Sequence, residues 1–76
     1  MWIRSESTKI SNIEGMLNTL FRGCDICSKT ELERKVQQLV ITNAEDGGYI
    51  KLEPRGEGSF QYRITPKGKE RRDNNL

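Results

Sequence analysis

The protein has 76 residues, of which 33% are hydrophobic, 32% charged and 7% aromatic. A chain of this length forms one domain at most, and it buries only about 60% of the surface that it exposes when unfolded. No apolar run approaches the roughly 20 residues needed to cross a bilayer, and the N-terminus lacks the apolar stretch of a signal peptide. We therefore expect a single domain over residues 1–76, located in the cytoplasm and not attached to a membrane.

The absence of histidine limits the chemistry that the chain can perform. It excludes Ser-His-Asp and Cys-His nucleophiles, and it removes the commonest metal ligand. We expect a protein that is not an enzyme and that needs no cofactor.

The net charge is +2, from 13 basic and 11 acidic residues. Residues 1–48 hold six basic and seven acidic side chains, whereas residues 49–76 hold seven basic and four acidic ones. A total this small does not by itself indicate a nucleic-acid partner. The positive charge is nevertheless concentrated in the C-terminal third.

The pattern predicts a first helix over residues 11–23. Ser11 is the expected N-cap, Glu14 completes a capping box, and Gly23 is the expected C-cap. Trp2 and Ile3 precede this helix as candidates for a short edge strand or a contact with the core. One apolar face follows the helical period: Ile13, Met16, Leu17, Leu20 and Phe21.

A second helix is predicted to begin between Ser28 and Thr30, where two capping boxes overlap, and to end by Glu45, before Gly47 and Gly48. Its expected inner face holds Leu32, Val36, Leu39 and Val40. Its expected outer face holds Thr30, Arg34, Gln37, Gln38 and Ile41, with Lys35 on the flank.

Two strands follow, because residues 49–53 and 60–65 alternate between apolar and polar side chains. The glycine-rich link over residues 54–59 predicts a hairpin, with Pro54 ending the first strand. Thr65 and Pro66 are typical of a helix start, so a short helix to about Arg72 is expected, with a frayed tail over residues 73–76. Ile50 and Leu52 are expected to share one face of the first strand, and Phe60, Tyr62 and Ile64 one face of the second. Phe21, Phe60 and Tyr62 are assigned to the core and Tyr49 to the surface.

Two motifs in this order resemble the winged helix-turn-helix superfamily. The first is Gly48-Tyr49-Ile50, and the second is Tyr62-Arg63-Ile64-Thr65-Pro66-Lys67-Gly68. The resemblance covers residues 11–72 and implies an α+β winged helix with a two- to three-stranded antiparallel wing. Members of this family have three helices before the wing, whereas the pattern here predicts two. We expect residues 24–28 to form a single turn with Ile26 as its contact with the core.

The resemblance and the surface chemistry together predict a small transcriptional regulator that binds specific sequences of double-stranded DNA. Arg pairs with guanine, Gln pairs with adenine, and Ile41 suits a thymine methyl group; a cationic hairpin suits phosphates. A lone module of this size favours a homodimer on a palindrome. The predicted DNA contacts are Thr30, Arg34, Lys35, Gln37, Gln38, Lys51, Arg55, Arg63 and Lys67.

Plainer explanations of the same residues stay open. A solvated helix face also carries Arg, Gln and Lys, and an edge hairpin carries cations that discourage strand pairing. The alternative function is a winged-helix protein–protein interaction module that acts on transcription machinery or another partner.

Cys24 and Cys27 form a CxxC motif that has three interpretations. It supplies two of the four ligands of a structural zinc site. It is a candidate redox pair, because it precedes a helix N-terminus that lowers a thiol pKa. In the third interpretation the two cysteines are small, half-buried residues of a tight connection, and their thiols stay free in a reducing cytoplasm.

Overall fold

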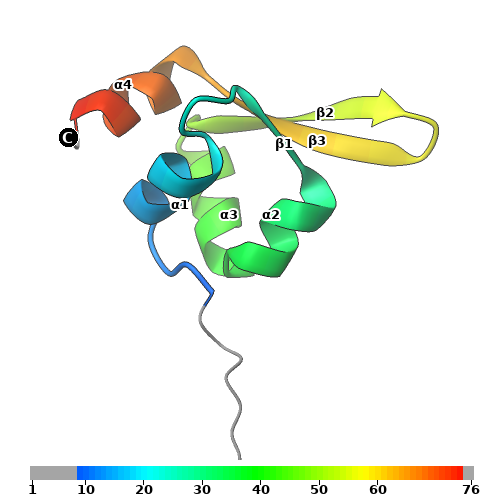
Figure 1. Ribbon diagram of the computed structural model, residues 1–76, viewed down its shortest axis with the longest axis horizontal. Coiled ribbons are helices and arrows are strands. Elements are labelled where there is room, and N and C mark those ends of the chain that lie inside the picture. Colours follow the sequence, from blue (N-terminus) through cyan, green and yellow to red (C-terminus); the bar gives the residue numbers. More distant parts are fainter. Residues whose placement is uncertain (1–8, 75–76) are drawn as a thin grey trace, which may run out of the picture.

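A computed structural model of the protein describes residues 9–74 (Figure 1). This part of the chain has an α+β fold, as expected, with four helices and one three-stranded antiparallel sheet. In chain order the elements are α1 (Ile13–Leu20), β1 (Ile26–Ser28), α2 (Lys29–Lys35), α3 (Gln38–Asp46), β2 (Ile50–Gly56), β3 (Ser59–Ile64) and α4 (Pro66–Asn74). Trp2 and Ile3, for which an edge strand was one expectation, lie outside the described residues.

The prediction of one helix from residues 28–30 to Glu45 is wrong, because the chain breaks between α2 and α3. Val36 (φ −128°, ψ 141°) and Gln37 (φ −64°, ψ 141°) are extended. The N–H of Ile10 donates to the carbonyl of Lys35 at 2.9 Å, and the N–H of Gln37 donates to the carbonyl of Ile10 at 3.0 Å. A segment from before α1 therefore supplies hydrogen bonds that the helix gives up at the break.

The break also changes which side of α3 faces the core. Val40, Ile41 and Ala44 are buried, whereas Leu39 is 68% exposed. The sequence predicted Leu39 inside and Ile41 outside, and both predictions are wrong. A single helical wheel does not apply across two helices whose axes differ.

The sheet has the strand order β1-β3-β2. Cys27 lies opposite Tyr62, and Ile50 lies opposite Ile64, so these four buried side chains share the face that packs on the helices. The expected turn with Ile26 as a core contact is wrong. Residues 26–28 form β1 instead, and because neighbouring residues of a strand point to opposite faces, Cys27 points inward and Ile26 is 41% exposed.

The hairpin is longer than predicted and extends beyond the helices (Figure 1). Pro54 does not end β2; it pairs with Phe60, and β2 continues to Gly56. Proline is compatible with this position because β2 is an edge strand of the described sheet. Phe60 was expected in the core, but it is 45% exposed on the part of the hairpin that the helices do not cover.

The helix ends also differ in detail from the prediction. Asn12, rather than Ser11, caps α1, since its Oδ1 accepts a hydrogen bond from the N–H of Gly15 at 2.6 Å. The C-cap is Phe21 rather than Gly23. The start of α4 is confirmed at Pro66, and α4 runs to Asn74 instead of ending at about Arg72.

The core consists of residues from three helices and all three strands of the described chain. Its buried side chains are Met16, Leu17, Phe21, Cys27, Leu32, Val36, Val40, Ile41, Ala44, Ile50, Tyr62 and Ile64. Between residues 9 and 74, no helix has the length and apolar character needed to span a membrane.

Candidate nucleic-acid interface

The exposed side of α3 begins with uncharged residues, three of them polar and one apolar. Gln38, Leu39, Thr42 and Asn43 are exposed, and the Gln38 Nε2 atom donates to Thr42 Oγ1 at 3.4 Å. Among the described residues, the Gln37 side chain at the N-cap makes no hydrogen bond to the first turn of α3. This turn carries N–H groups without a helical partner and the positive end of the dipole, which suit an anion.

Positive charge near α3 comes from other elements, because α3 itself contains neither Lys nor Arg and ends in Glu45 and Asp46. Arg34 and Lys35 occupy the last turn of α2, directly before the break. Lys51 and Arg55 lie on β2 and are exposed, and because strand residues alternate, Lys51 points to the face of the sheet opposite Ile50 and the helices. Cations thus lie before the N-terminal end of α3, whereas its C-terminal end is acidic.

The structure distributes the predicted DNA contacts over six parts of the chain. Thr30, Arg34 and Lys35 are on α2, Gln37 is at the break, Gln38 is on α3, Lys51 and Arg55 are on β2, Arg63 is on β3, and Lys67 is on α4. The expectation that the helical members share one helix face is therefore wrong. Ile41, the predicted thymine contact, is fully buried and cannot take that role.

Ion pairs divide these cations into two groups. Lys35 Nζ lies 3.0 Å from Glu31 Oε2, and Arg63 Nε lies 2.8 Å from Glu53 Oε2. The hydrogen bond from Arg63 holds the pKa of Glu53 below its ordinary value of 4.5, and a second hydrogen bond from Gln61 adds to this effect.

The second group keeps its charge available for a ligand. Within residues 9–74, Arg34, Lys51 and Arg55 form no ion pair with an acidic side chain, and all three are exposed. These three cations are therefore the strongest candidates for phosphate contacts among the predicted residues.

A groove brings the hairpin close to α2. Arg55 and Gln61 of the hairpin, Glu31 and Lys35 of α2, and Leu20 of α1 are among the residues that line it. The groove therefore places the hairpin cation Arg55 on the same side of the molecule as Lys35 of α2, whereas Arg34 does not line it.

The inner face of the hairpin has a different character. Leu52 is 38% exposed and Phe60 is 45% exposed on the face that also carries Tyr62. The Tyr62 hydroxyl donates to Glu45 Oε1 at 3.5 Å. Burial raises the pKa of Tyr62, and the negative charges of Glu45 and Glu33 raise it further. This face is therefore apolar with acidic groups beside it.

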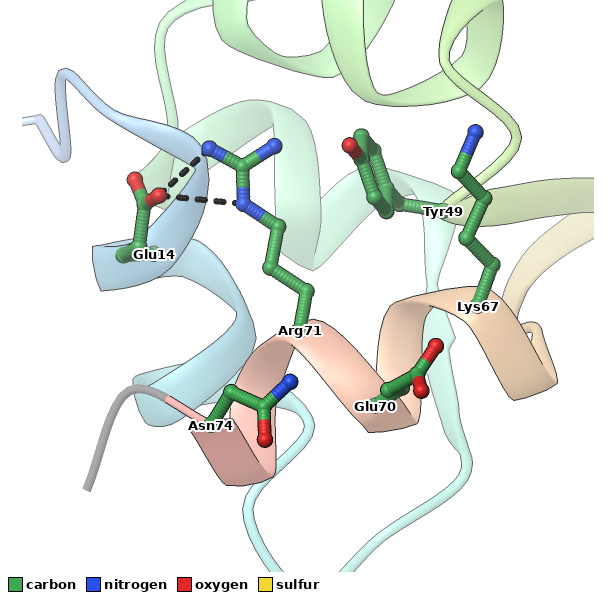
Figure 2. Close-up of a pocket in the computed structure, with 6 residues that line it drawn as sticks. All are labelled: Glu14, Tyr49, Lys67, Glu70, Arg71 and Asn74. Carbon is green, nitrogen blue, oxygen red and sulfur yellow. Dashed lines mark hydrogen bonds and ion pairs between the residues drawn. The ribbon is translucent and has the colours of Figure 1, made fainter.

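A second charged cluster lies between α1 and α4 and surrounds a pocket (Figure 2). The Tyr49 ring lies between the side chains of Arg71 and Lys67, with the Arg71 guanidinium carbon 4.7 Å and the Lys67 ammonium 5.0 Å from the ring centre. Arg71 Nε also donates to Glu14 Oε2 at 3.0 Å, and this bond lowers the pKa of Glu14 below 4.5. Lys67 thus belongs to the junction of α1 and α4 and lies beyond the C-terminal end of α3.

Sequence reasoning missed Thr42 and Asn43 on the exposed side of α3, and it assigned Leu39 to the core. It also missed the cluster of Glu14, Tyr49 and Arg71, whose members are distant in the chain. No local signal identified this cluster, because each of the three residues is ordinary in its own helix or strand pattern.

The two cysteines are free thiols. Cys24 is exposed and Cys27 is buried, and burial raises the pKa of the Cys27 thiol above 9.0. A raised pKa opposes thiolate chemistry at Cys27. Across residues 9–74 there is no group of three or more His, Cys, Asp or Glu side chains placed to hold a metal ion.

Comparison of the chain with protein-family models, with curated proteins and with solved structures finds no match. Its function therefore has to be inferred from the geometry of the chain itself.

Proposed function

We propose that this protein is a winged helix-turn-helix domain that binds double-stranded DNA as a small transcriptional regulator. The observation that carries this proposal is the break at Val36 and Gln37, which divides residues 29–46 into α2 and α3. The order of elements, α1-β1-α2-α3-β2-β3-α4, then contains the third helix that the resemblance implies. In this arrangement α3 is the reading helix and the β2–β3 hairpin is the wing.

The N-terminal half of α3 is suited to contact base edges in a major groove. Helix-turn-helix proteins place the first residues of the second helix against the bases. Gln38 and Thr42 offer hydrogen-bonding groups, and Leu39 offers an exposed apolar contact for a thymine methyl group. The first turn of α3 and the nearby Arg34 suit the phosphates on the rim of that groove.

The wing supplies further backbone contacts through Lys51 and Arg55. These cations have no acidic partner within the described chain, so binding to phosphate requires no ion pair to be broken. A single module of this size buries about 600–1,000 Å² on DNA. We therefore propose that two copies bind a palindromic site, which the stoichiometry of the complex in sedimentation velocity tests.

Fluorescence anisotropy with a labelled 20-base-pair duplex tests the proposal. Affinity is expected to fall steeply with rising salt, and Arg34→Ala and Arg55→Ala are each expected to reduce the slope of log affinity against log salt by about 0.9. Arg22→Ala is the matched control, because Arg22 is an exposed cation after α1. Failure of the wild-type protein to bind any duplex at low salt would exclude the proposal.

A second candidate function, a protein-interaction module, is favoured by one observation. The apolar side chains of Leu39, Leu52 and Phe60 are exposed, and Glu45 and Asp46 end the helix that would read DNA. Exposed apolar groups beside acidic ones are typical of a protein-binding surface. In that case Leu52→Ser and Phe60→Ser impair partner binding, while the wild-type protein shows no affinity for DNA.

A further inference from the structure

α4 is attached to the body of the protein in an unusual way. The core cluster contains no α4 side chain, and Gly68 is the one buried residue of this helix. The other α4 side chains are polar or charged except Pro66, which is exposed. Hydrophobic burial therefore contributes little to holding α4 in place.

Charged contacts take the place of an apolar interface. Arg71 pairs with Glu14 of α1 and lies over the Tyr49 ring (Figure 2). The Arg72 Nη1 atom donates to the carbonyl of Phe21 at 2.7 Å, and Lys69 Nζ lies 3.4 Å from Asp25 Oδ2. These contacts turn three cations of α4 toward the body of the protein.

The first turn of α4 is fixed more firmly than the rest. The Thr65 hydroxyl donates to the carbonyl of Gly48 at 2.5 Å and accepts from the N–H of Gly68 at 3.0 Å. A Cβ atom at Gly68 would overlap the carbonyl oxygen of Tyr49, so the backbones approach closely there. Release of α4 is therefore expected to involve residues 69–74.

Charge contacts of this kind are weak where the side chains reach solvent. Ion pairs at a surface contribute little and are screened by salt, and a helix of nine residues is marginal without support from packing. The last two turns of α4 are thus expected to open at much lower free energy than the core.

We propose that residues 69–74 form a releasable basic arm, whose cations exchange the carboxylates of Glu14 and Asp25 for the phosphates of a polyanion such as a DNA backbone. The second half of this inference rests on the proposed function, whereas the release itself does not. In the attached state the cations are engaged internally, while Glu70 and Asp73 are exposed. In the released state Lys69 and Arg71 become available for phosphate, whereas Arg72 Nε also pairs with Asp73 Oδ1 of the same segment at 3.1 Å.

Hydrogen exchange of backbone amides tests the release without DNA. Between low salt and 1 M NaCl, the amides of residues 70–74 are expected to lose their protection while those of α3 and β3 keep theirs. Glu14→Gln is expected to produce the same loss at low salt. Glu70→Gln is the matched control, because it removes the same charge from an exposed residue of the same pocket without breaking an ion pair seen in the described chain.

If amide exchange accelerated equally in α3 and α4 at high salt, the release would be overturned, because α4 would then open only with the whole domain. Equal behaviour of Glu14→Gln and Glu70→Gln would overturn it as well. The same two variants test the phosphate contact by anisotropy on a 20-base-pair duplex. Glu14→Gln is expected to steepen the slope of log affinity against log salt by about 0.9, which corresponds to one added phosphate contact. Glu70→Gln is expected to leave this slope unchanged.

The two proposals fail in different ways. Absence of duplex binding by the wild-type protein contradicts the proposed function. Duplex binding whose salt dependence is the same for Glu14→Gln and Glu70→Gln contradicts the arm alone.

Discussion

α3 and α4 have the same length of nine residues but are held to the protein by different forces. α3 buries Val40, Ile41 and Ala44 in the core, whereas α4 buries only Gly68. Removal of apolar area from water is insensitive to moderate salt, and surface charge contacts are weakened by it. The difference indicates a rigid α3, suited to present side chains in a fixed register, and an α4 whose attachment depends on solution conditions.

The largest expected effect tests how α3 is held. Ile41→Ala is expected to lower the free energy of unfolding by about 2–5 kcal/mol, because Ile41 is fully buried. Leu39→Ala is expected to change it by about 0.5 kcal/mol or less, because Leu39 is 68% exposed. Urea denaturation of both variants measures these two changes in the free energy of unfolding. If Leu39→Ala destabilised the protein more than Ile41→Ala, Leu39 rather than Ile41 would face the core, as a single helix through Val36 requires.

The next effect tests the packed end of α4. Gly68→Ala is expected to lower the free energy of unfolding by about 1–3 kcal/mol or to displace α4, since the added methyl group meets the Tyr49 carbonyl and lies 2.8 Å from Ile64 Cγ1. Gly56→Ala is the control, because a Cβ atom at Gly56 meets no atom within 4 Å. Thermal denaturation that is the same for both variants would mean that α4 does not approach the body at Gly68.

Acid is expected to release α4 before it unfolds the core. The pKa of Glu14 in the folded protein lies below its ordinary value of 4.5, chiefly because Arg71 donates a hydrogen bond to the carboxylate. This contact therefore stabilises the attached helix above pH 4.5 and is lost as the pH falls through the lowered pKa. The amide signals of residues 70–74, followed by NMR from pH 7 to pH 3, report the loss of this contact. In Glu14→Gln the Glu14 contribution to this transition is expected to vanish, and a transition identical to that of the wild-type protein would contradict the assignment.

The smallest effect concerns the cysteines and leaves stability unchanged. Iodoacetamide at pH 8 is expected to modify Cys24 rapidly and Cys27 slowly, because Cys27 is buried and its pKa is raised. Mass spectrometry of the two peptides over time distinguishes the rates. Equal rates would show that β1 opens readily and would strengthen the redox interpretation of the CxxC motif.

Much of the fold could be predicted from local sequence patterns. The helix before Phe21, the alternation in both hairpin strands and the start of α4 at Pro66 each depend on neighbouring residues, and the structure confirms them. The polar face of α3 was only partly predicted: Gln38 was identified, whereas Thr42 was not.

The break between α2 and α3 could not be predicted in the same way. Leu32, Val36, Leu39 and Val40 fall at helical spacing, and neither Gly nor Pro interrupts them. The decisive contact is made by Ile10, whose backbone pairs with Lys35 and Gln37 from a distant part of the chain. The charge contacts of α4 were missed for the same reason, because Glu14 and Arg71 meet only after folding.

Chemical-shift mapping by NMR tests the central claim most directly. On addition of a 20-base-pair duplex at low salt, the amide signals of residues 37–43 and of the hairpin around Lys51 and Arg55 are expected to move, while those of α1 stay in place. Shifts confined to Leu52, Phe60 and their neighbours, or no shifts at all, would contradict DNA binding by α3 and the wing.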